Sequence, residues 1–98
     1  MALTHALYTP GELMRQIADD ARRLRLAQDL SRATLATRSG VPAPTIKRFE
    51  TTGRISLESL VLLAGALGAG DRLHTLFAPP PPDSLEQLKR GPRQRGRK

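Results

Sequence analysis

Cysteine and tryptophan are absent from this chain of 98 residues, and its only histidines are His5 and His74. Without cysteine there can be no disulfide and no thiolate metal site, and the two histidines are too far apart for a two-histidine zinc motif. We therefore expect neither a metal nor a cofactor. No acid, base and nucleophile can be grouped from residues outside the expected core, so the sequence disfavours an enzyme.

Long apolar runs are also missing. The longest, LVLLAGALGAG at residues 60–70, is too short to cross a bilayer and is interrupted by Gly65 and Gly68. The N-terminus has no basic region followed by an apolar stretch and a cleavage site. These absences favour a cytoplasmic protein, and the length suits one compact domain with a tail.

Acidic residues are few compared with basic ones. Nine Asp and Glu oppose sixteen Lys and Arg, which gives a formal net charge of +7. The imbalance is sharper in residues 31–54, because Glu50 is the only acid there. The basic residues of that stretch are Arg32, Arg38, Lys47, Arg48 and Arg54. Such a surface suits a polyanion, and nucleic acid fits better than an acidic membrane.

Three helix starts share one pattern, in which an apolar residue precedes a Ser or Thr cap and another follows four residues after the cap. The caps are Thr9, Ser31 and Ser56, and at the first of them Pro10 and Glu12 complete a capping box. Apolar spacing and glycine breaks predict five helices, at about 10–28, 32–38, 43–50, 57–67 and 71–77. No segment alternates like a strand, so we expect an all-α fold.

The expected core draws on most of these helices. We expect Leu13, Ile17, Ala21 and Leu24 on the inner face of the first helix, Ile46 and Phe49 in the third, most of residues 60–67 in the fourth, and Leu73, Leu76 and Phe77 in the last. His74 is expected in the core or on a dimer surface and not in a ligand site.

Two short helices joined by a turn at Gly40 indicate a helix-turn-helix. Further matches at fixed positions are Ser31, Leu35-Ala36, Gly40-Val41, Thr45-Ile46, Phe49-Glu50, Ser56-Leu57 with Leu60, and Ala66-Leu67-Gly68. Over residues 10–77 the sequence resembles the Xre and lambda-repressor helix-turn-helix family. The resemblance implies a lambda-repressor-like domain that binds double-stranded operator DNA on the nucleoid as a homodimer and represses transcription.

In that family the third helix begins with polar residues that read base edges in the major groove, but here those positions hold Pro42, Ala43 and Pro44. Two rules place the helix start differently. The apolar spacing makes Pro42 the cap, whereas a residue before proline disfavours helical angles and moves the start to Pro44. We favour the cap at Pro42. These three residues can contact a thymine methyl but cannot hydrogen-bond a base through their side chains. Direct reading then falls to Thr45, Lys47 and Arg48.

The resemblance also implies contacts with the DNA backbone. The family commonly has Gln after the cap Ser31, and Arg32 at that position keeps a phosphate donor and adds a charge. Further phosphate candidates are Thr51, Thr52 and Arg54. Taken singly, Arg32, Lys47 and Arg48 are better read as solvated surface charges, but together on a matched helix-turn-helix they favour contact with phosphates or bases. Thr45 can simply cap locally. By resemblance, Glu50 pairs with Arg25 in a structural salt bridge.

The sequence divides into an N-terminal arm at 1–8, the helix-turn-helix domain at 9–78, and a tail at 79–98 with a Pro-rich spacer, a short helix and a basic end. The stretch YTPGEL at 8–13 resembles the start of HipB-type antitoxins, which repress their own operon and accompany a HipA-type kinase toxin. The four prolines of the spacer cannot join the dimer strand of such antitoxins, so we expect dimerisation by helix pairing.

The function of the tail stays open at this point. It can bind a protein partner, follow the DNA backbone or only solubilise the chain. The preferred interpretation is a sequence-specific repressor that is the autoregulating antitoxin of a HipA-type operon. Two alternatives follow from the same residues. One is a partner-binding module that holds a toxin kinase, with DNA binding secondary, and the other is a stand-alone phage-type repressor.

Overall fold

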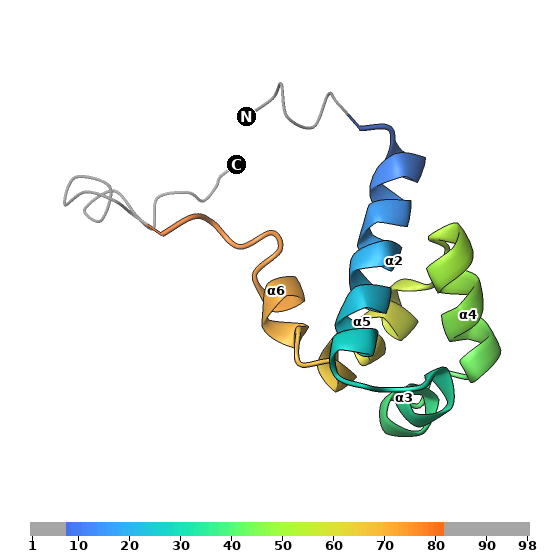
Figure 1. Ribbon diagram of the computed structural model, residues 1–98. Helices are drawn as coiled ribbons and strands as arrows, with labels where there is room; N and C mark the ends of the chain where they lie inside the picture. Colours follow the sequence, from blue (N-terminus) through green and yellow to red (C-terminus); the bar gives the residue numbers. More distant parts are fainter. Residues whose placement is uncertain (1–7, 82–98) are drawn as a thin grey trace, which may run out of the picture.

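A computed structural model describes residues 8–81 of the chain, so the expectations for the arm before Tyr8 and for most of the tail lie outside the described residues. This part consists of five α-helices and contains no strand, which confirms the all-α, lambda-repressor-like fold (Figure 1). The helices are α2 (Pro10–Ala27), α3 (Arg32–Ser39), α4 (Ala43–Thr52), α5 (Leu57–Ala66) and α6 (Gly70–His74).

The arrangement of the helices separates two sides of the domain. α2 packs along α4, and α3 contacts both α4 and α5. α6 contacts α5 and lies on the side of it that faces away from α4 (Figure 1). The largest fully buried side chains are Leu35, Val41, Ile46 and Phe49, none of them more than 2 % exposed. The core therefore sits beneath α3, α4 and the turn that joins them.

The expected helix starts are confirmed. The Thr9 hydroxyl accepts a hydrogen bond from the Glu12 N–H at 3.1 Å, and the Thr9 N–H donates to Glu12 Oε1 at 2.9 Å, which is a complete capping box. The hydroxyls of Ser31 and Ser56 accept from the N–H groups three residues later. Each cap satisfies N–H groups that have no partner inside the helix, so local sequence fixes where these helices begin.

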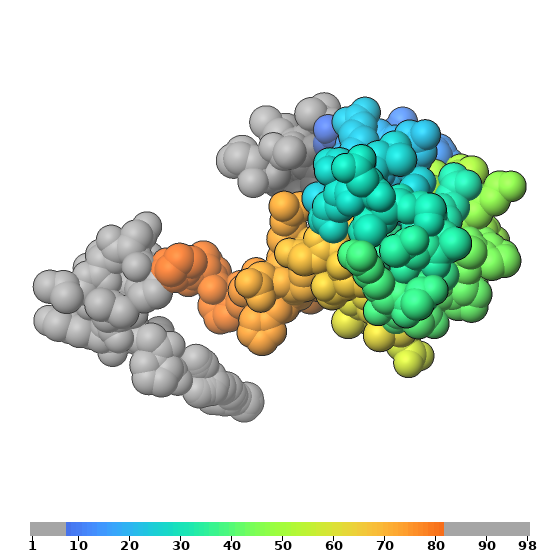
Figure 2. All heavy atoms as spheres, turned by 60° about the horizontal axis from the view of Figure 1, so that its bottom comes forward, coloured from blue at the N-terminus to red at the C-terminus, as the bar shows by residue number. Residues whose placement is uncertain are grey.

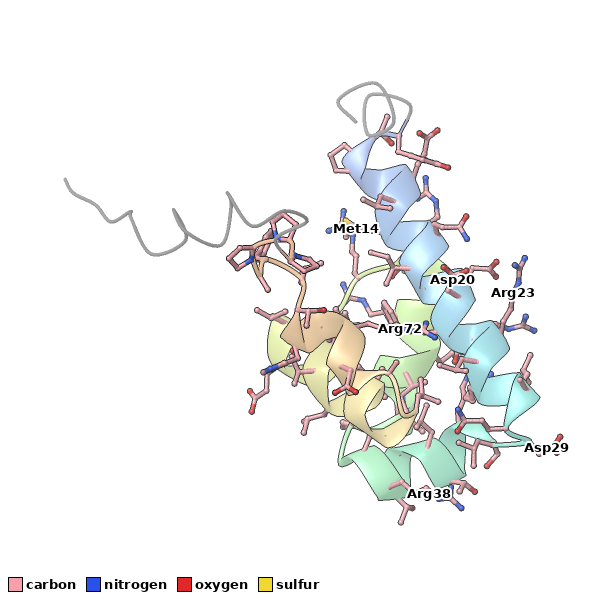
Figure 3. The ribbon with its side chains drawn as sticks, turned by 90° about the vertical axis from the view of Figure 1, so that its left-hand side faces the viewer. Met14, Asp20, Arg23, Asp29, Arg38 and Arg72 are labelled. Atoms are coloured by element: carbon pink, nitrogen blue, oxygen red, sulfur yellow. The ribbon has the colours of Figure 1, made fainter. Side chains whose placement is uncertain are left out.

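The end of α2 is less evident from the sequence. Asp29 adopts a left-handed φ of 57° at the turn towards α3 (Figure 3). Its N–H donates to the Leu26 carbonyl at 3.0 Å, and the Leu30 N–H donates to the Arg25 carbonyl at 3.1 Å. These two bonds form a Schellman motif, which usually has glycine at the left-handed position. Aspartate tolerates that conformation better than most residues, and here it allows the tight turn.

Two glycines with the same backbone conformation close α3 and α4. Gly40 and Gly53 both have a φ of 81° and donate to a carbonyl of the preceding turn. A Cβ added at Gly40 would meet no atom within 4 Å, whereas one at Gly53 would lie 2.9 Å from the carbonyl carbon of Met14. Gly53 therefore serves a close contact between the end of α4 and α2, in addition to its positive φ.

The predicted inner face of α2 is wrong in its first half. Leu13 and Ile17 are 46 % and 43 % exposed, and the buried residues of the helix are Ala18 and Arg25. Ala18 belongs to the core cluster that includes Phe49 of α4, and its small side chain suits the packing of α2 against that helix. Arg25, which periodicity would assign to the surface, is buried where it finds a carboxylate partner.

The predicted apolar contribution of the last two helices is also wrong in part. Among the residues of α5, only Leu63 is fully buried, while Val61 and Leu62 are 50 % and 44 % exposed. Leu76 and Phe77 are exposed because α6 ends at His74 and the following chain leaves the bundle. An apolar run marks a helix, but it does not tell how many of its faces have a neighbour.

Candidate nucleic-acid interface

The turn between α3 and α4 is short and is held by buried residues. Gly40 closes α3, and the buried Val41 donates its N–H to the buried Ser39 hydroxyl at 3.1 Å. Pro42 is the N-cap of α4, and its carbonyl accepts from the N–H groups of Thr45 and Ile46 at 3.0 and 3.1 Å. The expected start at Pro42 is confirmed, and Pro44 occupies the first turn, where its missing N–H has no helical partner to lose.

The outer face of α4 carries the basic residues. Ile46 and Phe49 point into the core, and Lys47 and Arg48 are exposed between them on the other side of the helix. The residues at its start are partly covered, since Ala43 and Thr45 are half-buried whereas Pro44 is exposed. This is the alternation of a helix that packs on one side and presents its other side to solvent.

Thr51 and Thr52 are exposed at the end of α4, but their hydroxyls are engaged with the helix itself. Thr51 Oγ1 donates to the Lys47 carbonyl at 3.0 Å, and Thr52 Oγ1 donates to the Arg48 carbonyl at 2.7 Å. The Arg54 N–H in turn donates to Thr52 Oγ1 at 3.1 Å. Both hydroxyls must rotate before they can donate to a phosphate, which makes Arg54 the better placed of these three candidates.

Glu50 lies under this surface and binds two arginines. Its carboxylate accepts from Arg25 Nε at 2.7 Å and from Arg25 Nη2 at 3.0 Å, and Arg32 Nε donates to Glu50 Oε1 at 2.9 Å. The Glu50 side chain is 2 % exposed and that of Arg25 is 7 % exposed. Arg25 Nη1 also donates to the Leu30 carbonyl at 2.8 Å, so the network joins α2, α3 and α4.

Two opposing effects set the ionisation of Glu50. Burial of the carboxylate raises its pKa, but the hydrogen bonds and the charges of Arg25 and Arg32 outweigh burial and hold the pKa below its ordinary value. The group is therefore a carboxylate at neutral pH. The structural pair of Arg25 and Glu50 agrees with the expectation from the sequence.

The bond between Arg32 and Glu50 is the feature that sequence reasoning missed. The sequence offered a phosphate contact or a solvated charge for Arg32, but its Nε binds a buried carboxylate while 35 % of its side chain stays exposed. Ser31 beside it uses its hydroxyl to cap α3 and to donate to Thr34 Oγ1. The one feature of the sequence that could have indicated this bond is Arg32 at a position where the family commonly has a neutral Gln. The sequence does not show how close Arg32 lies to Glu50.

The candidate DNA-binding residues belong to two helices that pack against each other and to the loop after the second. They lie at the start of α3, along the outer face of α4 and in the loop after it, and the two helices form a continuous surface in Figure 2. Residues 8–81 hold no group of three His, Cys, Asp or Glu that could bind a metal, and none of the helices described there is long and apolar enough to cross a membrane.

Comparison with known proteins also finds a helix-turn-helix in this part of the chain. A family model for helix-turn-helix domains matches residues 22–71, from the middle of α2 to the start of α6. No curated protein matches the chain. The matched segment covers half of the chain and includes α3, the turn at Gly40 and α4. The chain therefore belongs to the Xre and lambda-repressor-like helix-turn-helix family, whose domains bind DNA and regulate transcription.

Proposed function

We propose that this protein is a sequence-specific transcriptional repressor that binds a pseudo-palindromic operator as a homodimer, with α4 in the major groove. The observation that carries the proposal is the exposed outer face of α4, where Lys47 and Arg48 form no salt bridge within the described residues. Lys or Arg binding to guanine is the commonest specific contact in the major groove. The domain at 9–78 would be the DNA-binding unit.

Base reading in this proposal relies on few hydrogen bonds. Pro42, Ala43 and Pro44 offer only apolar contact, and the half-buried Thr45 can reach a base only at close approach. Lys47 and Arg48 would therefore give most of the direct reading, and DNA shape would contribute the rest. Arg32, Arg54 and the first N–H groups of α3 at Ser31 would hold phosphates, with Thr51 and Thr52 as weaker contacts.

A homodimer is supported by an apolar surface on α5, α6 and the residues just after α6, which we call the α5–α6 patch. Its residues line a depression of about 420 Å³ and are Leu57, Val61, Leu73, His74, Leu76, Phe77 and Ala78. Phe77 is 94 % exposed and Leu57 is 73 % exposed, and such grouped apolar side chains mark contact sites. No Lys, Arg, Asp or Glu lines the depression, so two copies can meet there without repulsion between charged side chains.

The position of the α5–α6 patch fits a second copy better than another occupant. α6 lies on the opposite side of α5 from α4, so a partner on the patch leaves both α4 helices free (Figure 1). A two-fold operator needs two reading helices about one turn of DNA apart. Helix pairing at this surface also replaces the dimer strand that the prolines of the spacer exclude.

We extend the proposal to an autoregulating antitoxin of a HipA-type operon. Its support is the resemblance of YTPGEL to HipB-type antitoxins, where Thr9 and Glu12 form the capping box. Deletion of residues 83–98 separates the alternatives. If the deletion abolishes binding of a co-expressed HipA-type kinase and leaves operator affinity intact, the tail is the partner-binding segment. If no kinase binds the full chain, a stand-alone repressor remains.

The proposal is tested by fluorescence anisotropy with the full chain. The protein is titrated against its own upstream intergenic DNA and against a scrambled duplex at two salt concentrations. We expect a preference for the upstream DNA that persists at the higher salt, because base contacts do not release counterions. Equal and steeply salt-dependent binding to both duplexes would contradict autoregulation and would favour the partner-binding module.

A further inference from the structure

Arg32 is held at one edge and free at the other. Its Nε donates to Glu50 Oε1 at 2.9 Å, and within residues 8–81 none of its hydrogen bonds uses the two Nη groups. The carboxylate below is 2 % exposed and is itself fixed by two hydrogen bonds from the buried Arg25. The planar guanidinium is therefore bound at its Nε to a fixed acceptor, while 35 % of the Arg32 side chain is exposed.

A long side chain loses conformational freedom when it binds a phosphate, and this loss weakens the contact. A side chain that is already held in one orientation loses less. Arginine suits this arrangement, because its rigid guanidinium carries five N–H donors and can bind two acceptors at once. Lysine has a single ammonium group and cannot present one fixed edge to a carboxylate and another to a phosphate.

We propose that Glu50 is a positioning residue for DNA binding, which orients Arg32 so that its Nη groups meet a backbone phosphate when α4 enters the major groove. This inference rests on the proposed function and deepens it, since Glu50 belongs to α4 and Arg32 to α3. The carboxylate couples the phosphate contact of one helix to the orientation of the reading helix. Glu50 itself touches no DNA.

The sign of one affinity change tests this inference. Glu50→Gln removes a negative charge, so electrostatics alone would tighten binding to any duplex. Loss of positioning would weaken it, and we expect a roughly three- to tenfold weaker Kd, which corresponds to the net contribution of about one ordinary hydrogen bond. Glu58→Gln is the matched control, because it removes one exposed acidic charge on α5. It should leave binding unchanged or slightly tighter.

The experiment measures Kd for a mixed-sequence duplex with wild type, Arg32→Ala, Glu50→Gln and the double variant, at a temperature where circular dichroism shows each to be folded. We expect Glu50→Gln to weaken binding in the Arg32 background and to have no weakening effect once Arg32 is alanine. Equal weakening in both backgrounds, or tighter binding with Arg32 present, would overturn the inference.

Arg32→Lys gives a second test in which Glu50 and Arg25 themselves are not substituted. The charge is kept, so a simple phosphate charge predicts nearly wild-type binding. We expect Arg32→Lys to bind almost as weakly as Arg32→Ala, and wild-type affinity would contradict the positioning role. If Arg32→Ala itself binds like wild type with the same salt slope, the phosphate contact in the proposed function fails as well. The two failures are therefore distinguishable.

Discussion

α3 and α4 differ from α5 and α6 in what they leave exposed. α3, α4 and their turn contribute Leu35, Val41, Ile46 and Phe49 to the core and expose mostly polar and charged side chains. α5 and α6 contribute few fully buried residues and expose the apolar side chains of the α5–α6 patch. The first pair of helices buries its large apolar side chains, whereas the second pair exposes an apolar surface that no other part of residues 8–81 covers.

The difference indicates two kinds of contact in one small domain. The surface of α3 and α4 carries basic side chains, which suit the phosphates and base edges of DNA. One of them, Arg32, is bound to the buried carboxylate of Glu50. The α5–α6 patch has no charged lining and suits another apolar surface. If this division holds, substitutions in the two regions should affect different measurements.

The largest effect is expected where α4 closes on α2. Gly53→Ala combines a positive φ with a Cβ 2.9 Å from the Met14 backbone, so we expect a loss of about 3 kcal/mol or more in unfolding free energy. Gly40→Ala is the matched control with the same φ of 81° and no near neighbour, and it should lose about 1 to 2 kcal/mol. Urea unfolding measures both, and equal losses would show that the contact with α2 is unimportant.

Acid should lower the free energy of unfolding because Glu50 becomes protonated. Its pKa is lowered in the folded state, so its stabilisation is present above the ordinary value of 4.5 and is lost as the pH falls through the folded pKa. One such group changes the unfolding free energy by at most about 1.4 kcal/mol per pH unit. Glu50→Gln should flatten this part of the curve of unfolding free energy against pH. A variant with an unchanged acid slope would contradict the assignment.

The outer face of α4 should control which base sequence is preferred. We expect Arg48→Ala to reduce discrimination at one operator position by about 1 to 3 kcal/mol, and Lys47→Ala to act at a neighbouring position. Arg38→Ala, an exposed basic residue at the end of α3, should weaken all sequences equally or not at all (Figure 3). Selection from a random duplex library measures the preference. Unchanged preference in Arg48→Ala would show that α4 is not the reading helix.

The smallest effect on folding is expected in the α5–α6 patch. Phe77 is 94 % exposed, so Phe77→Ser should change the unfolding free energy of the monomer by less than about 0.5 kcal/mol. The dissociation constant of the dimer should rise roughly tenfold or more, because a buried aromatic side chain contributes about 1.5 to 3 kcal/mol. Analytical ultracentrifugation measures the dimer. A wild-type chain that stays monomeric at high concentration would remove the patch from the proposal.

The helix starts and the turn were predictable because their determinants are local. Hydroxyl caps at Thr9, Ser31 and Ser56 act within three residues, and Gly40 is needed for a positive φ. These features depend on adjacent backbone groups, which the sequence specifies directly. The fold class followed from them.

The errors concern contacts between helices that are distant in sequence. Periodicity predicted that Leu13 and Ile17 lie on the buried face of α2. In the structure the buried residues of that helix are Ala18 and Arg25. The bond from Arg32 to Glu50 spans 18 residues and depends on how α3 meets α4. Such contacts follow from packing in three dimensions, and the spacing of residues within one helix does not specify them.

The most direct test of the division between the two surfaces is a ¹H–¹⁵N correlation spectrum of the full chain. One sample is titrated with operator DNA, and a second sample without DNA is diluted. We expect DNA to shift the amide signals of residues 31–34, 43 and 45–54, and dilution to shift those of residues 57–78. If DNA instead shifts residues 57–78 and leaves 42–54 unchanged, α4 does not read the operator and the account is wrong.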